Sequence, residues 1–192
     1  MNTLKLVIVG GHQVGKTCLL LTMCGSRYPG DYIPTCYCGY SRRVNVDNRS
    51  YEVGFFDVSG LEEYKRLRVL VYPQTDVFLL CFSVVSQSSF NDLRTEWYPE
   101  IVHHCPGVAF LVVGTKVDLR DDLQTQMRLK ENDQSAVTVE MGEHLATELS
   151  AAKYVECSSL SGQGLDTIFN EAVAAALTPP PPKKKEKKCV VL

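Results

Sequence analysis

Hydrophobic and polar residues alternate along the chain in blocks that predict strands and helices in turn. Five short hydrophobic runs have the length of strands: residues 4–9, 51–56, 77–83, 108–113 and 153–157. Several are apolar at consecutive positions, as buried parallel strands are. Four segments between them are long enough for crossover helices: residues 16–25, 87–104, 139–150 and 164–177. This order predicts an α/β fold, a parallel sheet with helices on both faces.

Two stretches depart from this alternation. Residues 41–57 contain two runs joined by the turn formers Asp47 and Asn48, which predicts an antiparallel hairpin at one edge of the sheet. Residues 120–134 are polar and predict an exposed insertion with a short helix. Taken alone, that insertion indicates little about function.

Composition narrows the class of protein. A chain of 192 residues is long enough for one well-buried domain, and we expect a domain at residues 1–178 followed by a tail at residues 179–192. No hydrophobic run approaches the roughly 20 residues of a membrane-spanning helix, and the N-terminus lacks signal-peptide features. The eight cysteines form no CxxC pair, which favours free thiols in a cytosolic protein. We expect a monomer without a nucleic-acid partner.

The sequence GGHQVGKT at residues 10–17 follows the first buried strand and opens the first helix. It matches the pattern GxxxxGK(S/T), whose glycines let backbone N–H groups wrap around a phosphate chain. In that pattern Lys16 reaches the outer phosphates and the Thr17 hydroxyl binds Mg²⁺. The alternative is a glycine-rich turn that binds nothing, but the position between a strand and a helix favours the phosphate site.

The segment TKVDL at residues 115–119 directly follows a predicted strand. The Asp118 carboxylate can accept hydrogen bonds from two adjacent N–H donors on the edge of guanine, which adenine does not offer. The stem of Lys116 can cover the face of the ring. Ordinary loop charges are the alternative, and the position after a phosphate-binding loop favours guanine.

Two further segments are weak signals by themselves. CSSL at residues 157–160 follows the last strand and could place backbone N–H groups near Ser159 at the guanine carbonyl oxygen. YIPT at residues 32–35 could place the Thr35 hydroxyl on Mg²⁺, or it is a plain loop shaped by Pro34.

Together with DVSG at residues 57–60, these motifs in this order resemble the Ras superfamily of small GTPases. The chain is similar to the Rho family in particular, closest to its Rac and Cdc-type members, through TKVDLRDD, HHCP, YVECS, the insertion at roughly 121–135 and the lysine-rich tail. The resemblance runs from Leu4 to Leu192. It implies a P-loop NTPase fold: a six-stranded, mostly parallel sheet with one antiparallel edge strand and helices on both faces. It also implies switch segments at residues 28–40 and 58–70.

The resemblance further implies a site for GTP or GDP with Mg²⁺. Phosphate contacts are expected from Gly10, Gln13, Val14, Gly15, Lys16, Thr17, Cys18, Thr35 and Gly60. Guanine contacts are expected from Tyr28, Thr115, Lys116, Asp118, Ser158, Ser159 and Leu160. The metal ligands would be Thr17, Thr35 and Asp57. The effector loop would contain Tyr32, Thr35, Cys36, Tyr37, Cys38, Gly39 and Tyr40.

Two catalytic positions depart from the family pattern. His12 stands where the family has glycine, and a side chain there projects toward the terminal phosphate, into the space of an activator's arginine finger. Leu61 replaces the glutamine that positions the attacking water, and leucine supplies neither a donor nor an acceptor. We therefore expect a chain that binds GTP but hardly hydrolyses it. The alternatives are that His12 turns to solvent, or compensates phosphate charge when protonated.

Other differences concern partners rather than the reaction. Cys38 replaces an aspartate and Tyr37 a phenylalanine, which predicts weaker binding of the usual Rac-type effectors. Ser59 replaces alanine and could accept the terminal phosphate, although a small residue at a tight turn is the simpler interpretation. Tyr28 replaces a phenylalanine beside guanine, and Phe56 occupies a position linked to the choice of exchange factor.

The C-terminal sequence TPPPPKKKEKKCVVL contains three consecutive signals. Four prolines favour an extended spacer, and KKKEKK carries +4, which leaves about −6 on the rest of a chain whose net charge is −2. CVVL is a CaaX box, and its final Leu192 predicts a geranylgeranyl lipid on Cys189. A prenyl chain with a polybasic run satisfies the two-signal requirement for stable anchoring to anionic lipids. A nuclear localisation signal or a solvated basic run is the alternative.

The leading hypothesis is a membrane-anchored, Rho-like GTP-binding switch that hydrolyses GTP poorly and recruits effectors for actin or polarity signalling. It would act at the cytoplasmic face of the plasma membrane, with a cytosolic pool. Expected partners are Rho-type effectors, exchange factors, a GDI-like carrier and anionic lipids. The alternatives are an ordinary cycling GTPase whose partner supplies the missing groups, and a decoy that sequesters exchange factors.

Overall fold

The computed structural model of the chain describes residues 2–30, 37–46 and 48–178. A six-stranded sheet in the order β2-β3-β1-β4-β5-β6 forms its centre. The strands are β1 (Asn2–Gly10), β2 (Tyr37–Val46), β3 (Arg49–Val58), β4 (Val77–Ser83), β5 (Ala109–Thr115) and β6 (Lys153–Glu156). All neighbouring strands are parallel except the edge pair β2 and β3. The predicted α/β class and the antiparallel edge strand are confirmed.

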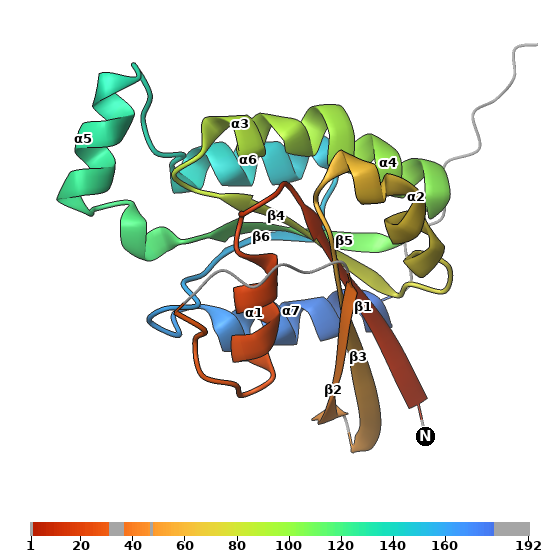
Figure 1. Cartoon of the computed structure of the whole chain (residues 1–192). Coiled ribbons are helices and arrows are strands. Elements are labelled where there is room, and N and C mark those ends of the chain that lie inside the picture. Colours follow the sequence, from red (N-terminus) through yellow and green to blue (C-terminus); the bar gives the residue numbers. More distant parts are fainter. Residues whose placement is uncertain (1, 31–36, 47, 179–192) are drawn as a thin grey trace, which may run out of the picture.

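Two helices cover one face of the sheet. They are α1 (Lys16–Met23) and α7 (Leu165–Leu177), which lie below the sheet in Figure 1. Leu19, Leu20, Ile168 and Phe169 from these helices pack with Leu6, Ile8 and Phe55 from the strands in one buried cluster. Alternate residues of the central strands therefore point into this layer, as strand geometry requires.

The other face is covered by α6 (Val139–Leu149) and by one long helical segment. That segment consists of α3 (Gln87–Asp92), the π-helical η3 (Leu93–Trp97) and α4 (Tyr98–His104). Side-chain oxygens of Ser86 and Thr138 cap the N-termini of α3 and α6, which explains why the helices begin there. The helix predicted over residues 87–104 is confirmed, and the structure adds a π turn at Leu93–Trp97.

A short helical segment after β3 lies against the same layer. It contains η1 (Glu62–Tyr64), α2 (Lys65–Arg68) and η2 (Val69–Val71). We did not predict these elements, because four helical residues are too few to give an amphipathic pattern. Their position is set by Arg68, whose guanidinium is buried against Glu100 of α4.

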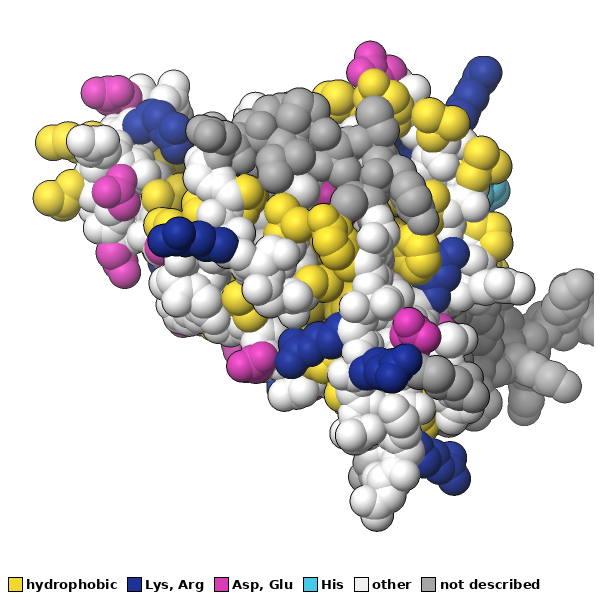
Figure 2. All heavy atoms as spheres, turned by 60° about the horizontal axis from the view of Figure 1, so that its bottom comes forward, with side chains coloured by type: hydrophobic (Ala, Val, Ile, Leu, Met, Phe, Trp, Pro, Cys, Tyr) yellow, Lys and Arg dark blue, Asp and Glu magenta, His cyan; other side chains and the backbone are white. Residues whose placement is uncertain are grey.

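The polar insertion projects from the body of the molecule, as predicted. It follows η4 (Val117–Leu119) and contains α5 (Leu123–Glu131), whose N-terminus is capped by the Asp122 carboxylate. Leu123 is 74% exposed and Met127 is 66% exposed. Figure 1 shows α5 at one end of the molecule, and Figure 2 shows hydrophobic side chains at the surface of that end. None of the helices in the described part of the chain is both long and apolar enough to span a bilayer.

The hairpin prediction is confirmed with two qualifications. β2 begins at Tyr37, four residues before the expected start, because CYCGY carries no clear alternation of polar and apolar residues. Of the two turn formers, Asn48 has a left-handed φ of 60°, while Asp47 lies outside the described residues.

Candidate functional site

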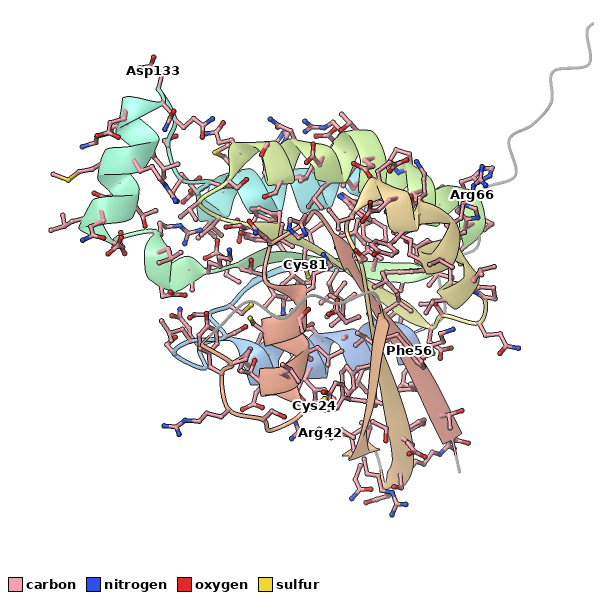
Figure 3. The ribbon with its side chains drawn as sticks, viewed as in Figure 1. Cys24, Arg42, Phe56, Arg66, Cys81 and Asp133 are labelled. Carbon is pink, nitrogen blue, oxygen red and sulfur yellow. The ribbon has the colours of Figure 1, made fainter. Side chains whose placement is uncertain are left out.

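The loop between β1 and α1 has a strongly curved backbone. Gly10 and Gly15 have φ values of 143° and 99°, and Gln13 has a φ of 59°. A Cβ atom on Gly10 would lie 2.1 Å from the carbonyl oxygen of Cys81, a residue that Figure 3 shows near the centre of the molecule. Left-handed residues in such a loop build concave arrangements of backbone N–H groups that bind anions. The conformation of the predicted phosphate-binding loop thus favours glycine at positions 10 and 15.

Lys16 is buried inside the curve of this loop. Its Nζ donates hydrogen bonds to the carbonyl oxygens of Gly10 at 2.8 Å and Gly11 at 2.7 Å. Burial lowers the pKa of Lys16, and the nearby Asp57 carboxylate opposes this shift. The loop therefore holds a desolvated positive charge, which interacts more strongly with an anion than an exposed one would.

Asp57 and Thr17 form a pair of oxygen donors beside Lys16. The Thr17 Oγ1 donates to Asp57 Oδ2 at 2.5 Å, and Asp57 is 1% exposed. The other carboxylate oxygen, Oδ1, is buried and has no hydrogen-bond partner in the described structure. Burial raises the pKa of Asp57, whereas the Thr17 hydrogen bond and Lys16 lower it.

This pair fits Mg²⁺. An unpaired, buried carboxylate oxygen is costly unless a ligand satisfies it, and Mg²⁺ prefers oxygen ligands. Across the residues that the structure describes, no group of three or more His, Cys, Asp or Glu could hold a metal. A site with one carboxylate and one hydroxyl suits Mg²⁺, which in phosphate chemistry usually takes few protein ligands and the rest from water and phosphate. The third predicted ligand, Thr35, lies outside the described residues.

A cavity of about 290 Å³ opens over this pair and the loop. Its lining includes Lys16, Thr17 and Asp57 together with His12, Tyr28 and Lys116. Gln13, Gly15, Cys18 and Gly60 also line it, so most of the predicted phosphate-binding residues meet in one place. The side chain of Val14 is instead buried in the core, and any phosphate contact from this residue would come from its backbone.

Hydrogen bonds join the TKVDL segment directly to the phosphate-binding loop. Thr115 Oγ1 donates to the Val14 carbonyl oxygen at 2.5 Å and to that of Phe82 at 2.9 Å. Lys116 has a left-handed φ of 61°, and its Nζ donates to the Gln13 carbonyl oxygen at 2.7 Å. Burial lowers the pKa of Lys116, while Cys18 and Asp118 raise it. Sequence segments about 100 residues apart thus form one wall of the cavity.

The remaining predicted guanine contacts are not among the described residues that line the cavity. Asp118 is within electrostatic reach of Tyr28 and Lys116. Ser158 is fully buried, and its Oγ accepts a hydrogen bond from the Ser161 N–H at 3.1 Å. Ser159 is half-buried and Leu160 is 61% exposed. The backbone N–H of Val117 donates to the Cys157 carbonyl oxygen at 3.2 Å, which joins the two segments.

The DVSGLEEY segment passes directly over the phosphate-binding loop. A Cβ atom on Gly60 would lie 2.4 Å from the Gly10 carbonyl oxygen, so only glycine permits this close approach. The backbone N–H of Leu61 donates to Ser59 Oγ at 3.3 Å, and its carbonyl oxygen accepts from Arg68 Nη1 at 3.0 Å. Leu61 is half-buried and is not among the described residues that line the cavity, whereas His12 is exposed at its edge.

The predicted effector loop is only partly described. Tyr32, Thr35 and Cys36 lie outside the described residues, as does the lipidation candidate Cys189. Tyr37 to Tyr40 form the start of β2, where the Cα of Cys38 pairs in register with that of Asp57. Gly39 and Tyr40 are exposed. This part of the predicted loop is therefore an edge strand.

Comparison with known families decides the class of protein. The model described as Ras family matches residues 5–178. The chain belongs to the Ras family. It is accordingly a small GTPase with a P-loop, and GTP or GDP with Mg²⁺ are the ligands of this family.

This Ras-family chain also contains two side-chain networks that sequence reasoning missed. Arg68 binds Glu100 through Nε at 2.9 Å and Nη2 at 2.7 Å, and the Tyr72 hydroxyl donates to the same carboxylate at 2.6 Å. A second network joins Arg120, Glu156 and Tyr154 next to the predicted guanine contacts. The sequence YVECS indicates part of the second network, because residues two apart in a strand, such as Tyr154 and Glu156, lie on the same face. Nothing in the sequence pairs either arginine with its glutamate.

Proposed function

We propose that this small GTPase is a Rho-like switch that binds GTP and Mg²⁺, hydrolyses GTP very slowly and is therefore mainly GTP-bound in the cell. The observation that carries the proposal is the apolar Leu61, directly after a Gly60 that touches the phosphate-binding loop. The catalytic step loses its water-positioning group, while the groups that hold nucleotide remain.

The binding role of each group follows from its position. Lys16 would neutralise the outer phosphates, and Thr17 and Asp57 would hold Mg²⁺. Mg²⁺ held there would supply positive charge that neutralises the outer phosphates. Tyr28, Lys116 and Asp118 would hold the base, with support from residues 158–160.

The expected defect is large. An activator's arginine finger contributes about 10³ to 10⁵ in rate, or roughly 4 to 7 kcal/mol of transition-state stabilisation. His12 is exposed at the edge of the cavity, where its side chain would occupy space that such a finger needs. Leu61 cannot orient water from any rotamer, because its side chain has no polar atom.

Nucleotide analysis of freshly purified protein tests this proposal. We expect mostly GTP, and single-turnover phosphate release far slower than that of an ordinary Rho GTPase, with or without a Rho-family activating protein. Mostly GDP with ordinary phosphate release would instead support a cycling enzyme and would overturn the proposal.

We further propose that the tail anchors the protein to the cytoplasmic face of the plasma membrane, with a cytosolic pool. Support comes from the sequence: Cys189 in a CaaX box, preceded by five lysines among residues 183–188. A Cys189→Ser variant should lose membrane association in cell fractionation. Retention of this variant on membranes would refute the lipid anchor.

The proposed partners are Rho-type effectors, exchange factors and a GDI-like carrier for the prenylated tail. The exposed Gly39 and Tyr40 on the edge strand, next to the altered Cys38, favour a changed set of effectors. A pull-down with Rac-type effector domains tests this, and binding as strong as that of an ordinary Rac-type protein would contradict it. No effector binding combined with tight exchange-factor binding would favour the decoy.

A further inference from the structure

The two segments that flank the proposed guanine site end in residues of opposite charge. Arg120 immediately follows η4, which contains Asp118, and Glu156 is the last residue of β6, just before residues 157–160. The two positions are 36 residues apart in sequence. Backbone hydrogen bonds already join the segments, from Val117 N–H to the Cys157 carbonyl and from Cys157 N–H to the Gly114 carbonyl at 2.8 Å.

Arg120 and Glu156 form a two-pronged ion pair. Arg120 Nη1 donates to Glu156 Oε2 at 2.8 Å and Nη2 donates to Oε1 at 2.5 Å. Their side chains are only 23% and 17% exposed. Burial alone would raise the pKa of Glu156, but hydrogen bonds from Arg120 and Tyr154 hold it below its ordinary value. Parallel double hydrogen bonds of this kind fix orientation as well as distance.

Tyr154 sets the Glu156 carboxylate in place from the other side. Its hydroxyl donates to Glu156 Oε1 at 2.6 Å, and its ring stacks on Phe82 with centroids 6.3 Å apart. Two glycines make room for it: a Cβ atom would lie 2.6 Å from the hydroxyl at Gly114 and 2.1 Å from the ring at Gly142. The carboxylate is therefore pre-positioned by a ring that is itself tightly packed.

Arg120 also binds the segment that directly follows the insertion. Its Nη2 donates to the Val137 carbonyl oxygen at 3.0 Å, and the Val137 N–H donates to the Val84 carbonyl oxygen at 2.7 Å. The 17-residue separation of Arg120 and Val137 spans α5. Arg120 therefore links three parts of the chain. It directly follows the segment of Asp118, and its guanidinium binds both Glu156 of the last strand and Val137 beyond α5.

We infer that Arg120 and Glu156 are positioning residues for guanine recognition, which hold the Asp118 segment and residues 157–160 at the separation that a guanine base requires. Neither residue touches the base in this role. The inference rests on the proposed nucleotide site. It predicts that loss of the pair weakens base recognition specifically, rather than nucleotide binding in general.

The test compares GDP with inosine diphosphate, which lacks the exocyclic amino group that Asp118 would bind. In the full-length chain, Arg120→Ala should raise the GDP dissociation rate about tenfold or more, the effect expected when charged hydrogen bonds that hold a site are lost. The preference for GDP over inosine diphosphate should fall toward one. Fluorescent-nucleotide chase and competition experiments measure both quantities.

The Arg94–Glu148 pair provides a matched control. It is also two-pronged, with Arg94 Nε donating to Glu148 Oε1 at 2.7 Å and Nη2 donating to Oε2 at 2.5 Å, but it joins η3 to α6. Arg94→Ala should leave both the dissociation rate and the preference unchanged. If Arg120→Ala does not fold, Glu156→Gln serves the same test, because it removes the carboxylate charge and retains the side-chain shape.

Three results would overturn the inference. The first is an Arg120→Ala variant that behaves like Arg94→Ala, and the second is an equal loss of affinity for both nucleotides. The third is a double variant in which the free-energy changes of Arg120→Ala and Glu156→Gln simply add. Substitutions of two residues that act through one interaction should not add in this way. Failure of the unmodified protein to bind GDP would instead overturn the nucleotide site itself.

Discussion

The Arg68 guanidinium donates a hydrogen bond to the carbonyl oxygen of Leu61 across 3.0 Å. The same guanidinium lies over the Trp97 ring at 4.6 Å and is paired with Glu100, so it is fully buried and cannot easily move. With the Leu61 N–H bound to Ser59 Oγ, the backbone is held on both sides of the substituted catalytic position. The proposed loss of hydrolysis would therefore come from the Leu61 side chain and not from a misplaced loop.

From this follows a rescue experiment. Leu61→Gln should raise single-turnover GTP hydrolysis by about 10²-fold, the lower end of what a positioned polar group contributes to a proton-transfer step. Adding His12→Gly should restore the response to a Rho-family activating protein. Phosphate release measures both. A Leu61→Asn control has the same amide on a shorter stem and should give much less, and no gain from Leu61→Gln would show that another residue limits the reaction.

The second prediction concerns the metal. Asp57→Asn removes the charge of the carboxylate whose Oδ1 has no partner among the described atoms. Loss of a residue that only supports a metal ligand costs roughly 10- to 100-fold in affinity. Because Asp57 would bind Mg²⁺ directly, we expect the GTP affinity in Mg²⁺ buffer to fall by more than that. In excess EDTA, the variant and the unmodified protein should bind GTP about equally. An equal loss with and without Mg²⁺ would contradict a metal role for Asp57.

The third prediction concerns stability and pH. Burial would raise the pKa of Glu100, but hydrogen bonds from Arg68 and Tyr72 hold it below its ordinary value of 4.5. A lowered folded-state pKa stabilises the fold above the unfolded-state pKa, and this contribution is lost as pH falls through the folded-state value. Glu100→Gln should therefore destabilise the protein at pH 7, and the difference from the unmodified protein should shrink below about pH 4.5.

The cost at pH 7 should be about 3 kcal/mol, the low end for breaking a buried ion pair. The low end applies because Arg68 would still have two carboxylates nearby in the variant. Its Nη2 lies 3.5 Å from a Glu96 oxygen and 3.7 Å from a Glu62 oxygen. Urea unfolding at several pH values measures the effect. Glu148→Gln, in a pair whose side chains are 45% and 39% exposed, should cost less than about 1 kcal/mol. Equal costs for the two variants would show that burial of Arg68 is unimportant.

The fourth prediction concerns the lipid. A terminal leucine favours geranylgeranylation, whereas a terminal serine favours farnesylation. Leu192→Ser should therefore exchange a C20 lipid for a C15 lipid on Cys189. Each buried CH₂ contributes about 0.8 kcal/mol to membrane binding, so the variant should dissociate from anionic vesicles more readily. Intact-mass measurement of protein from eukaryotic cells identifies the lipid, and an unmodified Cys189 in both proteins would refute the prediction.

What could be predicted from the sequence was mostly local. The phosphate-binding loop was evident because eight consecutive residues carry it, and the backbone geometry at Gly10 and Gly15 favours glycine. The parallel sheet was evident because its central strands are buried on both faces and thus apolar at consecutive positions, as in the first six residues of β4. Asp57 was recognisable as a candidate metal ligand because it lies near the end of a hydrophobic strand, three residues before Gly60.

The networks could not be predicted, because they join side chains from separate elements. Arg68 and Glu100 are 32 residues apart, and their contact depends on the path of a helix that contains a π turn. Arg120 looked like an ordinary charge of a polar insertion. Only the fold brings it against Glu156, and no pattern of hydrophobic residues reports such a meeting.

The anchoring of the insertion at both ends has a practical consequence for labelling. Arg120, the first residue of the insertion, binds Val137 just after its last residue, while Asp133 lies at its outer end, well away from the sheet (Figure 3). A fluorescent domain fused to the C-terminus would block a CaaX motif, which must be terminal. An epitope or fluorophore inserted beside Asp133 would leave both chain ends free. The hydrogen bonds of Arg120 to Val137 and Glu156 would keep motion of the inserted label from reaching the sheet.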